Sequence, residues 1–433
     1  MARNSLRVFM VQAKNSLRAS IDKRQKVTLV IGNESADLDS ITSSILYAYI
    51  RSSAPPPKAF SPLYVPITNI PAADIQLRPE LLALLPHANL QAEHLITLDD
   101  LPNFSNLESK LCPEHTKWVL VDHNALQGTL GSIYADRVKG AIDHHDDDCK
   151  VPRDTGDEPR IITKSGSCTS LVTEYCRKPW DALSSNAMSS GTAGAQGDST
   201  LDDEAVASLW DAQIAKLALA SILIDTVDLT ATHKITRSDT SAVEYLEAKI
   251  MACPRTGKDF QRSHFFEQIN KAKTDISSLK LKDILRKDYK QWTEGGMNLG
   301  ISSVVKDLNF LRRKAKEEGG EKDARTAFVS TLKSFAKERD LAIMSVMTAS
   351  ASSEREFSRE LLVLALTDSG VKAAERFLTS NSEELGLEKA DGEEEKVEVD
   401  SEAKETTWVK VWKQGNVDHS RKRVAPMLRQ AMS

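Results

Sequence analysis

Short runs of valine, isoleucine and leucine recur through the first 250 residues, and each run ends in a cluster of polar residues. Segments with helical periodicity separate these runs. Such an alternation is typical of a parallel sheet covered by helices on both faces. The pattern therefore predicts a doubly wound α/β domain over residues 1–250. We predict its strands at 27–31 (VTLVI), 63–68 (LYVPIT), 95–100 (LITLDD), 117–123 (KWVLVDH) and 138–144 (VKGAIDH).

The rest of the chain predicts a second, smaller α/β domain with a mixed sheet over residues 290–433. Residues 251–289 lack strand-like runs and are predicted to form a helical linker between the two domains. Two segments of biased composition interrupt these domains. Residues 184–203 are rich in serine, glycine and alanine, which predicts a flexible insertion. Residues 388–405 are rich in acidic residues, which predicts a solvated loop.

The composition excludes several classes of protein. The chain has 433 residues, of which 40% are hydrophobic, and a net charge of −5, which argues against a general nucleic-acid binder. The sequence predicts no membrane span, because we find no apolar run of about 18 residues. The five cysteines show no CxxC spacing and are expected to be reduced thiols. We expect a monomer that binds neither nucleic acid nor membrane.

The N-terminal segment allows two interpretations. It contains Arg3, Arg7, Lys14 and Arg18 and has no acid before Asp22, as in a mitochondrial presequence. Alternatively it is an amphipathic first helix that packs on the domain. The second interpretation is favoured because little spacer separates it from the first strand, and it makes the cytoplasm the expected compartment. The side chains expected to pack are Leu6, Val8, Phe9, Met10 and Val11.

Acidic residues and histidines follow the ends of the predicted strands and helices. Because the carboxyl ends of parallel strands meet at one edge of a sheet, ligands of α/β domains bind there. Carboxylates and imidazoles without thiolates suit Mg²⁺ or Mn²⁺, and two such ions can clamp the oxygens of a phosphoryl displacement. The residues concerned are Asp37, Asp39, Asp122, Asp143, His144, His145 and Asp225.

Each of these residues also has a simpler interpretation. An aspartate at the end of a strand often caps the next helix, and Asp39 could do only that. The adjacent pair His144 and His145 is harder to explain by packing. The following Asp146, Asp147 and Asp148 are expected to be solvated. His123 is equally compatible with a hydrogen bond to a metal ligand and with a substrate contact.

Four motifs in order resemble those of the DHH phosphoesterase superfamily. They are GNESADLDS (32–40), DHN (122–124), DHH (143–145) and the later Asp225. The C-terminal region is similar to the second domain of family II inorganic pyrophosphatases and exopolyphosphatases, through RKDYKQW (286–292), MNLGISSV (297–304) and HSRKRVAPMLRQAM (419–432). This resemblance covers nearly the whole chain. It implies an active site in the cleft between two domains.

The resemblance also implies roles for individual residues. A pair of Mg²⁺ or Mn²⁺ ions would be held by Asp37, Asp39, Asp122, His144 and Asp225. Catalytic roles would fall to His145, Asp122 and Asp225. The substrate would be bound by Asn33, His123, His145, Lys290, Arg421 and Lys422, since a polyanion requires cations opposite the metal ions.

Two details of the motifs narrow the choice of family member. Asn33 stands where family II pyrophosphatases have a metal-binding histidine, and GNESADLDS resembles the fungal exopolyphosphatases. Prune-type relatives usually have DHR where this chain has DHH. We therefore expect an exopolyphosphatase that releases terminal orthophosphate from inorganic polyphosphate, through water activated by two metal ions. The alternatives are an inorganic pyrophosphatase, a prune-like cyclic-nucleotide phosphodiesterase, and an inactive scaffold that binds polyphosphate.

Overall fold

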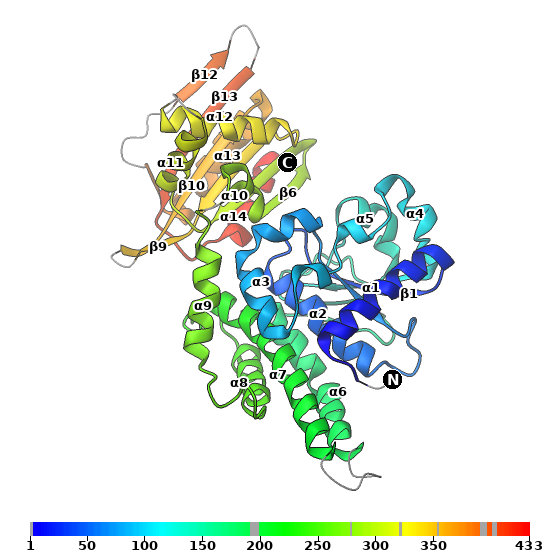
Figure 1. The fold of residues 1–433 in the computed structure, drawn as a ribbon. Coiled ribbons are helices and arrows are strands. Elements are labelled where there is room, and N and C mark those ends of the chain that lie inside the picture. The colour runs from blue at the N-terminus through cyan, green and yellow to red at the C-terminus, as the bar shows by residue number, and fades with distance from the viewer. Residues whose placement is uncertain are drawn as a thin grey trace. The chain divides into compact units, whose positions relative to one another are not determined.

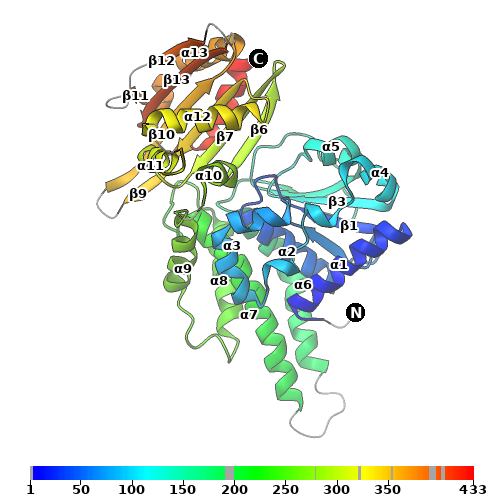
Figure 2. The same ribbon diagram turned by 45° about the horizontal axis from the view of Figure 1, so that its top comes forward.

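The computed structural model describes residues 3–190, 199–277, 279–319, 323–352, 355–389, 396–400 and 405–433. The chain divides into two compact units, Met1–Lys273 and Thr274–Ser433, which Figures 1 and 2 show from two directions. This division falls inside the segment 251–289 that was predicted as a linker. The reason is that helix α9 (Arg262–Thr274) buries Phe265 in the core of the N-terminal unit, whereas Leu281 belongs to a core of the C-terminal unit.

The N-terminal unit contains the predicted parallel sheet. Five strands lie in the order β2-β1-β3-β4-β5, and each neighbouring pair is parallel. Strands β1, β3 and β4 are buried along nearly their whole length, which explains their continuous apolar runs. The strands are β1 (Val27–Ile31), β2 (Tyr64–Ile67), β3 (Thr116–Val121), β4 (Val138–Asp143) and β5 (Arg160–Ile162).

Two details of this sheet differ from the prediction. The strand predicted at 95–100 is wrong, because only Thr97 forms an isolated bridge, with Thr68. The Asp100 carboxylate accepts the Thr97 backbone N–H at 3.0 Å, and this cap begins a short 3-10 helix in place of a strand (Leu98–Asp100). Strand β5 was not predicted, since its three half-buried residues carry a weak signal.

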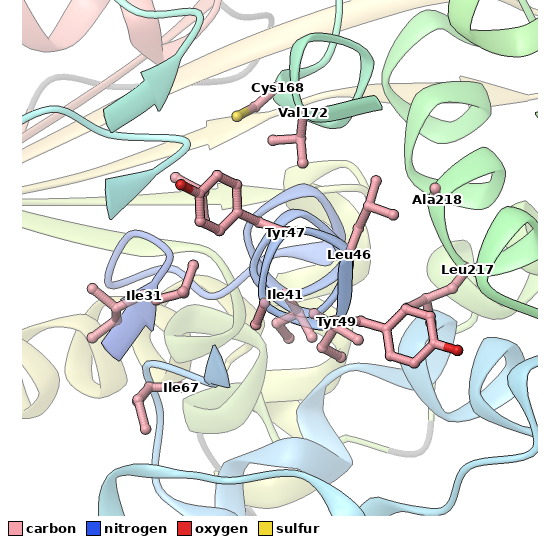
Figure 3. Packing of buried hydrophobic residues seen from close by; sticks show 14 of the residues in the cluster. Ile31, Ile41, Leu46, Tyr47, Tyr49, Ile67, Cys168, Val172, Leu217 and Ala218 are labelled. Atoms are coloured by element: carbon pink, nitrogen blue, oxygen red, sulfur yellow. The ribbon is translucent and has the colours of Figure 1, made fainter. Parts of the chain in front are cut away.

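Helix α2 (Leu38–Ser53) is the central helix of the N-terminal unit, and its residues 38–52 are all buried. Figure 3 shows it end-on, surrounded by side chains of β1, β2, α6 and α7. Its buried polar side chains have partners inside the unit, because the hydroxyls of Thr42 and Ser43 hydrogen-bond with Thr169 of α6. The helices of the unit are α1 (Leu6–Lys23), α2, α3 (Pro79–Leu84), α4 (Leu107–Lys110), α5 (Gly128–Tyr134), α6 (Cys168–Ser190), α7 (Ser199–Thr226), α8 (Arg237–Met251) and α9.

Helix α1 packs on the rest of the unit, as expected for an amphipathic first helix. Leu6, Phe9 and Met10 are buried in the core. The predicted packing of Val8 and Val11 is wrong, because these side chains are 44% and 47% exposed. They lie on the opposite face of the helix, since residues two positions from Leu6 and Phe9 are turned away by about 200°.

The segment predicted as a flexible insertion, 184–203, is partly helical. Helix α6 continues to Ser190 and α7 begins at Ser199, and residues 191–198 lie outside the described residues. Within the described part of the chain, one helical window, Ala205–Thr226, is long and apolar enough to cross a membrane, by length and composition only. Of that window, 72% is buried inside the protein, as expected for the core helix that α7 is here.

The C-terminal unit is built on the predicted mixed sheet, in the order β11-β13-β10-β8-β7-β6. Strands β7 and β8 are parallel, and the other pairs are antiparallel. Along β10, Leu361 and Val363 belong to one hydrophobic core and Leu362 and Leu364 to another. Both faces of this sheet are therefore covered by helices.

The described residues of the predicted acidic loop, 388–405, belong to strands. They form the end of β11, the whole of β12, which pairs with β13, and the first residue of β13. Residues 390–395 and 401–404 lie outside the described residues. The strands of the unit are β6 (Tyr289–Glu294), β7 (Met297–Val304), β8 (Ile343–Thr348), β9 (Ser350–Ser352), β10 (Arg355–Ala365), β11 (Leu387–Lys389), β12 (Lys396–Asp400) and β13 (Glu405–Gln414). The helices are α10 (Leu281–Lys287), α11 (Leu308–Gly319), α12 (Ala324–Lys337), α13 (Asp368–Leu385) and α14 (Arg421–Met432).

Candidate metal centre

The predicted acids follow the carboxyl ends of β1, β3 and β4. Strand β2 lies on one side of β1 and β3 on the other, so the order of the strands reverses at β1. In open α/β sheets such a reversal marks the place where ligands bind. The segment after β1 carries Asp37, the segment after β3 carries Asp122, and β4 ends at Asp143.

Asp122, His144 and His145 form a compact group of possible metal ligands. One ligand atom from each lies within 4.8 Å of the others. His144 Nε2 is 3.2 Å from Asp122 Oδ1, and His145 Nδ1 is 3.8 Å from the same oxygen. Asp122 and His144 are buried. A buried carboxylate therefore faces two imidazole rings.

The environment of His144 determines which of its nitrogens carries the proton. His144 Nδ1 lies 3.1 Å from the backbone carbonyl of Ser165, and a carbonyl can only accept a hydrogen bond. In the neutral ring Nδ1 therefore holds the proton, and the lone pair of Nε2 faces Asp122. Two acceptors 3.2 Å apart require a cation between them or a second proton on the ring. This donor set of one carboxylate and one imidazole fits a divalent metal ion.

Asp143, the first residue of the DHH motif, orients its neighbours. Its Oδ1 accepts the backbone N–H groups of His144 and His145 at 2.7 and 3.2 Å, and lies 2.7 Å from His145 Nδ1. Burial tends to raise the pKa of Asp143, but the hydrogen bond and charge of His145 outweigh it and lower the pKa below its usual value. The ionised carboxylate therefore fixes the ring of His145, a positioning role that the sequence did not reveal.

Asn124, the last residue of the DHN motif, connects this motif to the next one. Its Nδ2 donates to Asp143 Oδ2 at 2.6 Å and to the Asp146 carbonyl at 2.8 Å. Its Oδ1 accepts the Asp148 N–H at 2.7 Å. The predicted solvated acids include two ion pairs, Asp146 with Lys164 and Asp147 with Arg160. The spacing of DHN was the only sequence signal for Asn124.

The segment after β1 donates hydrogen bonds to the carboxylate oxygen of Asp122 that does not face the imidazoles. Asn33 Nδ2 and Ser40 Oγ each donate to Asp122 Oδ2 at 2.8 Å, which leaves Oδ1 toward the imidazoles. Asn33 Oδ1 accepts from the N–H and the hydroxyl of Ser35. Both ends of the Asn33 amide are thus engaged within the protein, and its predicted contact with substrate stays a prediction. A Cβ at Gly32 would lie 2.5 Å from Ser40 Cβ, so this close approach requires glycine.

Asp37 and Asp39 lie at the start of α2 but have different partners. Asp37 caps α2 by accepting the Ser40 N–H at 3.0 Å. Asp39 is buried and accepts hydrogen bonds from the start of α6 and from Ser221 of α7. Its Oδ1 accepts from Ser167 Oγ, Thr169 N, Thr169 Oγ1 and Ser221 Oγ, and its Oδ2 accepts from Cys168 N. As a metal ligand, Asp39 would therefore use Oδ2.

Asp225, near the end of α7, is linked electrostatically to these acids. Burial and the charge of Asp39 raise its pKa well above the usual value, Asp37 adds to this, and Lys273 and Lys234 oppose it. Helix α7 also contacts Asp39 directly, because Ser221, one turn before Asp225, donates to the Asp39 carboxylate at 2.9 Å. The structure therefore gathers the predicted metal ligands in one region of the N-terminal unit.

The remaining predicted residues have defined surroundings. His123 Nδ1 lies 3.0 Å from the Val121 carbonyl. Lys290 belongs to β6 in the C-terminal unit. In the same unit Arg421 donates to the carbonyl and the carboxylate of Asp288, at 2.8 and 2.6 Å. Lys422 follows in the first turn of α14.

Arg78 is a further residue that the sequence analysis did not identify. It is buried and donates hydrogen bonds to the carbonyls of Ser35 and Ala36. Ala36 has a φ of +42°, a conformation that residues other than glycine seldom adopt. Arg78 therefore stabilises the strained turn between Asn33 and Asp37. It lies in no recognisable motif, so no local signal pointed to it.

Comparison with known proteins identifies the family. Residues 27–196 match the model described as "DHH family, N-terminal domain", and residues 267–431 match the "DHHA2 domain". The chain is 32% identical over 419 residues to a protein of Schizosaccharomyces pombe named "Putative exopolyphosphatase", covering 95% of this chain and 92% of the relative. The chain therefore belongs to the DHH phosphoesterase family, and within it to the members that carry a DHHA2 domain. These are hydrolases.

Other relatives belong to two groups within this family. The human "Exopolyphosphatase PRUNE1" is 24% identical, with 96% of this chain and 78% of the relative covered. A "Manganese-dependent inorganic pyrophosphatase" of Methanothrix thermoacetophila is 27% identical over 66% of this chain and 73% of the relative. A solved structure, titled "Crystal structure of Methanococcus jannaschii putative family II inorganic pyrophosphatase", has the same fold, with a TM-score of 0.52 and 18% identity over 94% of this chain and 99% of that one.

Proposed function

We propose that this protein is an exopolyphosphatase, which hydrolyses the terminal phosphate from inorganic polyphosphate. The observation that carries this proposal is the buried pair of Asp122 and His144, whose facing acceptor atoms fit a divalent cation. The relative from Schizosaccharomyces pombe, matched over 92% of its length, supports polyphosphate as the substrate through its name. The chain's place in the DHH family supports hydrolysis of a phosphate bond.

We propose Mg²⁺ or Mn²⁺ as the cofactor, with two ions held by Asp37, Asp39, Asp122, His144 and Asp225. When bound, such ions polarise a phosphoryl oxygen and lower the pKa of water. The chain itself prepares the ligands. Ser165 fixes the tautomer of His144, and Asn33 and Ser40 orient Asp122. Outer contacts of this kind contribute about 10- to 100-fold to metal affinity or activity.

His145 is the proposed proton donor to the leaving phosphate. Asp143 holds His145 Nδ1 at 2.7 Å, so Nε2 is the nitrogen suited to exchange a proton with substrate. The side chain of His145 is 27% exposed, compared with 5% for His144, as expected for a group that meets an external ligand. Lys290, Arg421 and Lys422 are proposed to bind substrate phosphates, with Asp288 orienting the Arg421 guanidinium.

Purified protein supplied with Mg²⁺ or Mn²⁺ tests the proposal. Phosphate release is measured from long-chain polyphosphate, tripolyphosphate and pyrophosphate, and formation of AMP is measured from cyclic AMP. We expect rapid release from polyphosphate, slow release from pyrophosphate, and loss of release in Asp122→Asn. Activity confined to pyrophosphate or cyclic AMP would agree with the proposed metal centre but would contradict polyphosphate as the substrate.

An inorganic pyrophosphatase is the second candidate, and the Methanothrix thermoacetophila relative favours it. The position of Asn33 argues against it. In this structure its amide positions Asp122, whereas the resemblance to pyrophosphatases implies a metal-binding histidine there. The ratio of polyphosphate to pyrophosphate hydrolysis at saturating metal separates the two candidates. Release of phosphate from neither substrate would favour an inactive binding protein.

We propose the cytoplasm as the compartment and a monomer as the working state. The buried face of α1, with Leu6, Phe9 and Met10, supports a structural role for the N-terminal segment. Cell fractionation tests the compartment, and import into mitochondria with removal of α1 would contradict it. Light scattering on the purified protein tests the oligomeric state.

A further inference from the structure

Asp239 is a buried carboxylate that belongs to none of the predicted motifs. It lies in the first turn of α8, is fully buried, and accepts hydrogen bonds at both oxygens. Two come from Thr236, whose N–H and hydroxyl each lie 2.8 Å from Oδ2. The others come from the segment that joins β5 to α6 and from the first turn of α6. They are Ser165 Oγ at 2.9 Å, Gly166 N at 2.9 Å, Ser167 N at 3.1 Å and Ser170 Oγ at 2.7 Å.

The contacts of Asp239 exceed what capping a helix requires. The two bonds with Thr236 already form the capping arrangement at the start of α8. The other four bonds connect α8 to a segment about 70 residues earlier in the chain. Asp239 therefore fixes the backbone between Ser165 and Ser167 in addition to starting its own helix.

The peptide group between Ser165 and Gly166 connects Asp239 to the metal centre. The N–H of this peptide donates to Asp239 Oδ2 at 2.9 Å, and its carbonyl accepts His144 Nδ1 at 3.1 Å. Because a peptide group is planar, a bond that fixes its N–H also fixes the direction of its carbonyl. Hydrogen bonds in such a chain also polarise one another. Asp239 thus acts on the tautomer and orientation of His144 through one peptide.

The same segment contacts Asp39 and the direct neighbour of Asp225. A Cβ at Gly166 would lie 2.8 Å from Thr226 Cγ2, and Thr226 directly follows Asp225. The residues after Gly166 donate to Asp39, among them Ser167 at 2.8 Å. A shift of this segment would therefore disturb the surroundings of three predicted ligands together.

We propose that Asp239 is a positioning residue of the metal centre, which orients the Ser165–Gly166 peptide so that His144 presents Nε2 to the metal ion. This inference rests on the proposed function, because it requires that a divalent metal binds to His144. It assigns Asp239 no contact with metal or substrate. A role limited to the stability of α8 is the alternative.

The substitution Asp239→Asn tests this inference, with Asp211→Asn as the matched control. Asp211 is also a buried acid, in α7, and accepts from Trp180 Nε1 at 2.6 Å and Ser184 Oγ at 2.7 Å. Both substitutions remove one buried negative charge and disturb several hydrogen bonds. Calorimetric titration with Mn²⁺ gives the dissociation constant of each variant. The titration is carried out at a temperature at which that variant is still folded. Thermal unfolding without metal gives the loss of stability.

We expect Asp239→Asn to weaken Mn²⁺ binding by about 10- to 100-fold, and excess Mn²⁺ to restore its activity. We expect Asp211→Asn to unfold at a lower temperature while its Mn²⁺ affinity stays that of the wild type. Unchanged affinity in Asp239→Asn would overturn the inference. Equal weakening in both variants would overturn it as well, because it would show that affinity follows stability.

Ser165→Ala provides a second variant if Asp239→Asn does not fold. It removes one bond to Asp239 and keeps the carbonyl that accepts His144. We expect a smaller weakening of Mn²⁺ binding in the same direction, and affinity equal to the wild type would overturn the inference. A wild-type protein that binds no Mn²⁺ would overturn the proposed function and this inference together. Normal wild-type binding with unaffected variants would overturn this inference alone.

Discussion

Two buried carboxylates lie at opposite edges of the N-terminal sheet, and their surroundings differ in kind. Glu158 lies near the amino ends of the strands, where it accepts from Tyr47 and Tyr64 at 2.6 and 2.8 Å and pairs with Arg51 at 3.3 Å. Asp122 lies at the carboxyl ends, where its Oδ1 faces two imidazoles. The guanidinium of Arg51 thus balances Glu158, whereas Asp122 faces two imidazoles, which carry a positive charge only when protonated.

This difference separates a structural acid from a candidate metal ligand. Burial, and then the charge of Glu158, raise the pKa of Tyr47 and Tyr64, so both phenols stay neutral donors. Lys117 adds a second cation at 3.7 Å. At Asp122 a divalent cation can bind between the carboxylate and the His144 imidazole. The comparison teaches that burial of an acid does not by itself indicate a site, and that the charge of its partners decides.

The largest effect on stability is expected from Glu158→Gln. The substitution leaves Arg51 without its buried carboxylate, and removing one member of a buried ion pair costs about 3 to 5 kcal/mol. Urea unfolding measures this loss. The exposed neighbour Asp157 provides the control, since Asp157→Asn changes the same charge and should alter the free energy of unfolding by less than about 0.5 kcal/mol. Equal stability in the two variants would contradict a structural role for Glu158.

Asp122→Asn should lower the rate of phosphate release, in contrast to Glu158→Gln, which should lower stability. We expect phosphate release to fall by more than about 100-fold, since even contacts behind metal ligands contribute about 10- to 100-fold. Rates at saturating Mn²⁺, measured beside Glu158→Gln at a temperature where both are folded, test this. Substantial activity in Asp122→Asn would remove this carboxylate from the proposed centre.

Metal binding should stabilise the protein against heat. At a free Mn²⁺ concentration of about 100 times the dissociation constant, the expected stabilisation is about 2.7 kcal/mol. A chelator should reverse it. Glu158→Gln should unfold at a lower temperature than the wild type but should still be stabilised by Mn²⁺ to the same extent. Asp122→Asn should not be stabilised by Mn²⁺. An increment of the same size in Asp122→Asn would show that Mn²⁺ binds elsewhere.

The smallest effects are expected when one donor is removed at each edge. Tyr64→Phe deletes a hydrogen bond to Glu158, and should cost about 1 kcal/mol of unfolding free energy without altering Mn²⁺ affinity. Asn33→Ala deletes a donor to Asp122, and should weaken Mn²⁺ binding by about 10-fold or more. The free energy of unfolding and the Mn²⁺ affinity of both variants would show whether the surroundings of Glu158 act on stability and those of Asp122 on metal binding. Equal changes of both quantities in the two variants would contradict this distinction.

Some of the fold and site followed from local sequence. The runs at 27–31 and 138–144 identified β1 and β4, because strands buried on both faces consist of continuous apolar residues. The run at 95–100 was misleading, since a cap from Asp100 turns the chain there. Asp122 and Asp143 were identified because they lie directly at the ends of β3 and β4, whereas Asp37 and Asp225 lie at the ends of helices.

The sequence by itself determined the class of fold, the family and the set of acids and histidines at the strand ends. Only the tertiary structure decided what each of them does. Asp39 accepts from residues about 130 positions later in the chain, and Ser165 sets the tautomer of His144 from 21 positions away. Glu158 belongs to no recognisable motif, yet its carboxylate accepts hydrogen bonds from Tyr47 and Tyr64 and pairs with Arg51. Apolar periodicity is a local property that a sequence displays directly, whereas the bonding and charge balance of a buried carboxylate depend on groups that come together only when the chain folds.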